Sequence, residues 1–216
     1  DRVGPPEHLR WKANPRWCRS HEFASSIHTL ITANGRLFGI IDEGIIGQPR
    51  GVPAIWTLIA RDAFNGILLW KRPCARRSPA ALAAVGDRVY VVLSRGGPLC
   101  ILDAATGDTI RECTETGRID ELAVCGGMVV MNTNLKGANG KAGRHVAAAD
   151  AESGKVLWKE PAKSIGQFTL VVRDGRVCYH NGEQLVCRDL ENGRELWRAA
   201  AKGGKRGYAV MHDGVV

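Results

Sequence analysis

The sequence has no long apolar run. No stretch of its 216 residues approaches the roughly 20 consecutive apolar residues of a membrane-spanning helix, so we expect no such span here. Apolar residues nevertheless make up 44% of the chain, which is too many for a disordered polypeptide and enough for a substantial core. The net charge of +8 permits anionic partners but does not indicate a specific nucleic-acid ligand.

The cysteines lack every spacing that marks a metal or redox motif. There is no CxxC, no adjacent cysteine pair and no Cys/His cluster at zinc-ligand spacing, and the total is odd. Several cysteines lie within apolar runs, where this side chain behaves as a small hydrophobic group, so we expect mostly reduced core thiols. The seven positions are Cys18, Cys74, Cys100, Cys113, Cys125, Cys178 and Cys187.

Catalytic motifs are also absent. No serine stands in a G-x-S-x-G context, and the Gly-rich segment 137–143 lacks the Lys-Ser/Thr pair of a phosphate-binding loop. His21, Glu22 and His28 gather near the start, but the two histidines are seven positions apart rather than at HExxH spacing. We expect a polar linker there, with no catalytic residue and no metal ligand.

An internal repeat is the strongest feature present. Its pattern is Asp, three residues, Gly, three residues and then usually Trp, and its aspartates are 41, 47 and 39 residues apart, the range of β-propeller blades. The four copies are Asp62–Gly66–Trp70, Asp103–Gly107–Arg111, Asp150–Gly154–Trp158 and Asp189–Gly193–Trp197, with arginine in the tryptophan place of the second copy.

Two-residue hairpin turns keep phase with this repeat. Asn34-Gly35, Gly86-Asp87, Gly126-Gly127 and Asp174-Gly175 each precede a short apolar strand. Each unit therefore contains four short strands, which predicts an all-β propeller of four-stranded antiparallel blades. We expect one domain, an incomplete ring cut from a larger propeller. Its parts are the end of a preceding blade and linker at 1–26, full blades at about 27–71, 81–112, 121–159 and 168–198, and the start of another blade at 207–216.

The segment Ala148–Trp158 resembles the tryptophan-docking motif of PQQ-type repeats, and the resemblance extends over about residues 26–216. That family includes the quinoprotein alcohol dehydrogenases and the propeller lipoprotein of outer-membrane protein assembly. The resemblance implies that Trp70, Trp158 and Trp197 are structural residues lying between blades. It also implies a periplasmic or exported protein.

Two functions remain open. The first is a non-catalytic binding or scaffolding module within a larger bacterial protein, in contact with the remaining blades of its own propeller. The alternative is part of a PQQ-dependent dehydrogenase, in which a quinone and calcium would bind near the axis. The adjacent cysteine pair that such dehydrogenases carry is missing, and no cofactor is evident from these residues.

Charge distinguishes the two faces of the predicted propeller. The face formed by B–C loops and links between blades carries about 19 basic and about 8 acidic residues, whereas the opposite face carries about 8 and 11. Two long B–C loops emerge on the basic face. A protein or other anionic ligand could bind there, although loop lysines and arginines also serve solubility alone. The candidate residues are Arg50, Arg76, Arg77, Lys136, Lys141 and Arg144.

Overall fold

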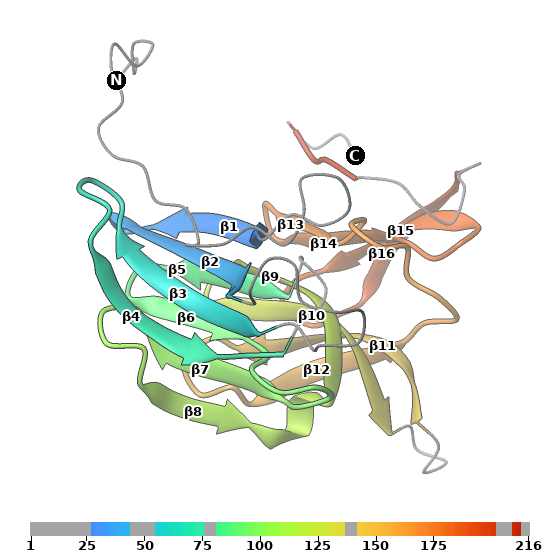
Figure 1. Cartoon of the computed structure of the whole chain (residues 1–216). Coiled ribbons are helices and arrows are strands. Elements are labelled where there is room, and N and C mark those ends of the chain that lie inside the picture. Colours follow the sequence, from blue (N-terminus) through green and yellow to red (C-terminus); the bar gives the residue numbers. More distant parts are fainter. Residues whose placement is uncertain (1–26, 44–54, 76–80, 137–141, 202–208, 213–216) are drawn as a thin grey trace, which may run out of the picture.

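Four antiparallel sheets, each of four strands, make up the described part of the chain (Figure 1). The computed structural model describes residues 27–43, 55–75, 81–136, 142–201 and 209–212. Within each sheet, every strand pairs with the next one along the chain, and tight turns or longer loops join them. This arrangement confirms the prediction of an all-β chain of propeller blades.

The first two blades lie between residues 27 and 113. Blade 1 consists of β1 (Ile27–Ala33), β2 (Arg36–Asp42), β3 (Trp56–Asp62) and β4 (Leu68–Pro73), and blade 2 of β5 (Leu82–Val85), β6 (Arg88–Val91), β7 (Leu99–Asp103) and β8 (Thr109–Cys113). A short 3-10 helix, η1 (Thr114–Thr116), leads to the third blade.

The other two blades continue to residue 200. Blade 3 consists of β9 (Arg118–Cys125), β10 (Met128–Lys136), β11 (Ala142–Asp150) and β12 (Val156–Pro161), and blade 4 of β13 (Val171–Arg173), β14 (Arg176–His180), β15 (Gln184–Asp189) and β16 (Glu195–Ala200). The first strands of successive blades contact one another, β1 with β5, β5 with β9, and β9 with β13. The blades are therefore stacked in chain order around their first strands, as in an incomplete propeller ring.

The repeated Asp–Gly pattern builds the turn between the third and fourth strands of every blade. In blade 3, Asp150 Oδ1 accepts hydrogen bonds from Ser153 N at 2.7 Å and Ser153 Oγ at 2.6 Å. Gly154 N donates to Asp150 O at 2.8 Å, and its φ of 69° is one that favours glycine. Asp62, Asp103 and Asp189 cap their turns through the same side-chain oxygen.

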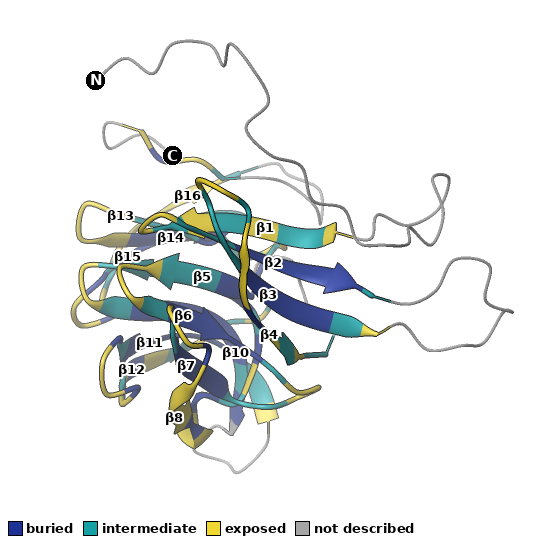
Figure 2. Ribbon diagram, turned by 60° about the vertical axis from the view of Figure 1, so that its left-hand side comes forward, coloured by how far each residue is buried: buried dark blue, intermediate teal, exposed yellow. Residues whose placement is uncertain are grey.

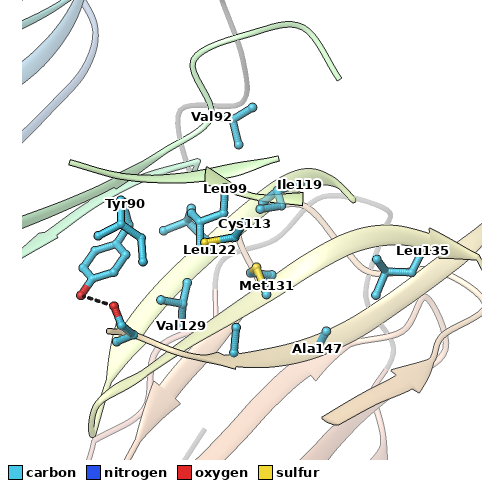
Figure 3. Close-up of a cluster of buried hydrophobic side chains, with 13 residues drawn as sticks. Tyr90, Val92, Leu99, Cys113, Ile119, Leu122, Val129, Met131, Leu135 and Ala147 are labelled. Carbon is cyan, nitrogen blue, oxygen red and sulfur yellow. Dashed lines mark hydrogen bonds between the residues drawn. The ribbon is translucent and has the colours of Figure 1, made fainter. Parts of the chain in front are cut away.

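Apolar clusters fill the three joints between blades. The middle strands are buried on both faces, whereas an outer strand such as β8 is largely exposed (Figure 2). Both-sided burial matches the apolar composition of these strands and is expected for sheets packed between neighbours. The cluster between blades 2 and 3 includes Tyr90, Leu99, Ile101, Ile119, Leu122, Val129 and Met131 (Figure 3).

The first strand of blade 4 begins later than the sequence predicts. We expected blade 4 to begin at about residue 168, but its first strand, β13, starts at Val171. Phe168 has a φ of 62°, and the backbone N–H groups of Phe168 and Leu170 donate to the Glu121 carboxylate of blade 3. Because these N–H groups are used across the joint, the segment does not join the ladder at this point.

Candidate functional site

Tryptophan side chains close two of the three joints between described blades. The Trp158 indole of blade 3 donates from Nε1 to the Leu190 carbonyl of blade 4 at 2.8 Å. Its ring covers Gly193, where a Cβ would lie 2.7 Å from the ring atoms, so only glycine leaves room for it. Trp70 makes the equivalent contacts between blades 1 and 2. Its Nε1 donates to the Ala104 carbonyl at 3.0 Å, and a Cβ added at Gly107 would lie 2.6 Å from its ring.

The joint between blades 2 and 3 is closed differently. Arg111 stands in the tryptophan place, and the Tyr90 hydroxyl donates to the Ala151 carbonyl at 3.2 Å (Figure 3). Ala151 follows the repeat aspartate, as Ala104 and Leu190 do in their turns. The space over Gly154 is occupied by Cys113, whose Sγ lies 2.1 Å from the position of an added Cβ. A tyrosine and a cysteine therefore replace the two contacts that one tryptophan makes elsewhere.

A groove of about 450 Å³ lies beside this joint. Its walls come from η1, the end of β10 and the outer strand β12, so it lies beside the β10–β11 hairpin. Leu157 is 47% exposed there, and Lys159 is exposed at the same strand. The lining residues are Glu115, Leu135, Val156, Leu157, Trp158 and Lys159. The groove thus combines an accessible apolar wall with one cationic and one anionic side chain.

A second hollow, of about 440 Å³, lies at the other end of the same joint, among the tight turns. Its charged lining residues are Asp87, Arg88, Asp150 and Glu152. Three carboxylates against one guanidinium make this end acidic. The two ends of one joint therefore differ in charge, with balanced charge at the loop end and excess negative charge at the turn end.

Arg144 is tied into the loop end of blade 3. Its guanidinium donates to Asn132 Oδ1 at 3.0 Å and lies 3.5 Å from Asp120 Oδ2. Arg118 lies 3.5 Å from the other oxygen of the same carboxylate. The positive charge of Arg144 is therefore partly neutralised, and its side chain connects β11 with β10 and β9 near the loop end of the β10–β11 hairpin.

Glu121 links blade 3 to blade 4 through a buried carboxylate. Only 5% of the residue is exposed, and its two oxygens accept from Phe168 N at 3.2 Å and Leu170 N at 3.3 Å. Burial raises the pKa of Glu121 to about 7, and the two backbone donors oppose that rise. The Glu121 carboxylate, which connects blades 3 and 4, therefore ionises near neutral pH.

Most predicted site residues fall where side chains are not described. Arg50, Arg76, Arg77 and Lys141 lie outside the described residues, and for Lys136 only the backbone, at the end of β10, is described. Lys159, on β12, was not among the candidate residues predicted from the sequence. Lys159 and Arg95 form no ion pair with any residue that the structure describes, in contrast to Lys71, Arg118 and Lys163.

Two classes of site are not found in the described part of the chain. No group of three or more His, Cys, Asp or Glu side chains there could hold a metal ion. No helix formed by the described residues is long and apolar enough to cross a membrane.

The sequence profile of the family described as outer membrane protein assembly factor BamB matches residues 57–214, which is most of the chain. The chain belongs to the BamB family. This match confirms the resemblance to PQQ-type propellers. No protein of curated function matches the sequence.

Solved structures support the same fold. BamB from Moraxella catarrhalis is 20% identical, with a TM-score of 0.50 over 81% of this chain and 63% of that one. The quinohemoprotein alcohol dehydrogenase from Comamonas testosteroni is 15% identical, with a TM-score of 0.58 over 89% of this chain and 37% of that one. The computationally designed protein Ika4 gives a TM-score of 0.55 at 16% identity, over 83% and 99% of the two chains. At these identities the likeness concerns the fold alone.

This BamB-family chain thus has two kinds of joint. The tryptophan joints are filled by an indole over glycine. The joint between blades 2 and 3 lacks the indole, and both hollows described above flank it. That joint is the best candidate for a binding site among the described residues.

Proposed function

We propose that this chain is a non-catalytic binding or scaffolding module of a larger propeller, and that it binds an acidic, partly apolar segment of a protein partner on its loop face. The groove beside β12 carries this proposal, because Leu157 offers an exposed apolar contact next to Lys159, which has no ion-pair partner among the described residues. The hollow at the other end of the joint is lined by three carboxylates, and their negative charge disfavours binding of an anion there.

Family membership supports a role with protein partners. The family is named for outer membrane protein assembly, and we propose that this chain likewise acts in an exported compartment. Leu135, near the end of β10, lines the groove, and loop insertions on one face of a repeat array commonly form the binding face. Arg50, Arg76, Arg77, Lys136 and Lys141 remain candidates for the surrounding positive surface.

A dehydrogenase role has weaker support. The similarity to quinohemoprotein alcohol dehydrogenase concerns the fold and covers 37% of that chain. The described residues do not offer a group of His, Cys, Asp and Glu side chains that fits a metal such as calcium, and the full sequence has no adjacent cysteine pair. We therefore assign no catalytic step to these residues.

Titration of the chain with poly-glutamate, and separately with PQQ plus calcium, tests the proposal. We expect saturable poly-glutamate binding that weakens steadily as salt rises, because exposed charges act through a field screened within about 8 Å at physiological salt. We expect no saturable quinone binding. Saturable binding of PQQ that requires calcium, together with no binding of poly-glutamate, would overturn the proposal in favour of the dehydrogenase.

A further inference from the structure

Two cysteines stand directly opposite each other in blade 4. Cys178 of β14 pairs in register with Cys187 of β15. Hydrogen bonds close the ladder at both ends of this hairpin. At one end Asn181 N donates to Gln184 O, and at the other Leu190 N donates to Gly175 O. In an antiparallel ladder, hydrogen-bonded residue pairs alternate with non-hydrogen-bonded pairs. Counting residue pairs from either end of the hairpin shows that Cys178 and Cys187 form a non-hydrogen-bonded pair.

That class of pair brings side chains close together. Opposed Cα atoms of a non-hydrogen-bonded pair are about 4.5 Å apart, which lies within the range that disulfides span. The two side chains lie in one buried cluster on one face of the sheet. The spacing of this class of pair is therefore compatible with a disulfide bond.

The other blades show that this place in the sheet does not require cysteine. In blades 1, 2 and 3, the positions that correspond to Cys178 on the second strand and Cys187 on the third strand hold hydrophobic side chains of various sizes. These pairs are Phe38 with Ala60, Tyr90 with Ile101, and Val130 with Ala148. Packing alone is therefore satisfied by ordinary hydrophobic residues, and two facing thiols distinguish blade 4.

We propose that Cys178 and Cys187 form a cross-strand disulfide when the chain folds in the presence of a small-molecule disulfide. One thiol, as thiolate, attacks the oxidant and releases one thiol from it, which leaves a mixed disulfide on the protein. The second cysteine then displaces the other half of the oxidant. The two cysteines lose two electrons and two protons in total, and the oxidant is reduced to two thiols.

The surroundings determine when this exchange takes place. Both cysteines have no exposed surface, and Met211 packs over them with Val171 alongside. Burial and the neighbouring thiol raise the pKa of Cys178 far above its ordinary value, so the folded protein supplies almost no thiolate there. We therefore expect rapid oxidation during folding and slow reaction of the native protein.

Refolding followed by peptide mapping tests the inference. The 216-residue chain is unfolded under reducing conditions and refolded with a mixture of oxidised and reduced glutathione, then alkylated and digested with trypsin. Both cysteines lie in the single tryptic peptide 177–188. We expect this peptide to be lighter by two hydrogen atoms and unalkylated, while peptides with Cys74 and Cys125 carry the label.

Stability supplies the second readout. The matched control is the double variant Cys178→Val with Cys187→Ala, which copies the Val130–Ala148 pair of blade 3. We expect the oxidised wild-type chain to unfold at higher urea than the reduced one, and the control to unfold at the same urea concentration in both conditions. Complete alkylation of both cysteines after refolding with oxidised glutathione would overturn the proposal. The proposal would also be overturned if oxidation raised the urea midpoint of the control as much as that of the wild-type chain.

Discussion

The Tyr90 hydroxyl donates to the Ala151 carbonyl at the point where the neighbouring joints receive an indole N–H. The acceptor is in each case the carbonyl of the residue that follows the repeat aspartate. The propeller thus keeps the acceptor and changes the donor, which moves from the outer strand to the second strand of the blade. A blade with arginine in the tryptophan place can dock in this way.

Removing the Tyr90 hydroxyl tests this replacement. Tyr90→Phe keeps the ring within the cluster but leaves the Ala151 carbonyl, in a buried residue, without this donor. We expect a loss of about 1–3 kcal/mol in the free energy of unfolding, the usual result when a buried group loses its partner. Urea denaturation measures it. An unchanged midpoint would show that the hydrogen bond does not hold the joint.

The tryptophans should differ in their contribution to stability. Trp158 is 8% exposed and packed over Gly193, so Trp158→Ala should cost about 3–5 kcal/mol, as for other buried large aromatics. Trp197 holds the same place in blade 4 but is 37% exposed. Trp197→Ala should therefore cost clearly less in the 216-residue chain. Equal losses in chemical denaturation would argue against docking as the source of the stability.

Glu121 should make stability depend on pH. Its pKa is about 7 in the folded chain against an ordinary 4.5, so the folded state favours the protonated form. The stabilisation that comes from protonated Glu121 is fully present below pH 4.5 and is lost as pH rises through 7. Because one pKa unit corresponds to about 1.36 kcal/mol, we expect the free energy of unfolding to fall by about 3 kcal/mol.

The matched variant for this prediction is Glu121→Gln, which keeps an acceptor for the N–H groups of Phe168 and Leu170 but cannot ionise. Urea midpoints of both proteins at pH 5 and pH 8 give the comparison. Wild type should lose more stability than the variant between these values. Parallel changes in the two proteins would mean that Glu121 is not the titrating group.

The sequence predicted the local repeat well because short-range chemistry determines it. The aspartate caps a turn of five residues, the glycine that ends it adopts a positive φ, and the successive turns set the strand order. Contacts between blades were harder to predict. Nothing in the spacing indicated that Tyr90 would replace an indole, that Arg144 would pair with Asp120, or that Glu121 would span a joint. These contacts depend on the approach of residues distant in sequence, which the repeat pattern does not encode.

The most direct test of the proposed function compares charge reversals at the two ends of one joint. Lys159→Glu changes the groove on the loop face, and Arg88→Glu changes the hollow among the turns, so both variants alter the net charge equally. Titration of each with poly-glutamate at several salt concentrations gives the affinity. We predict that Lys159→Glu weakens binding about two- to fivefold at low salt, the scale of exposed charge interactions, while Arg88→Glu has little effect. Equal weakening by both variants, or binding that does not respond to salt, would contradict the account.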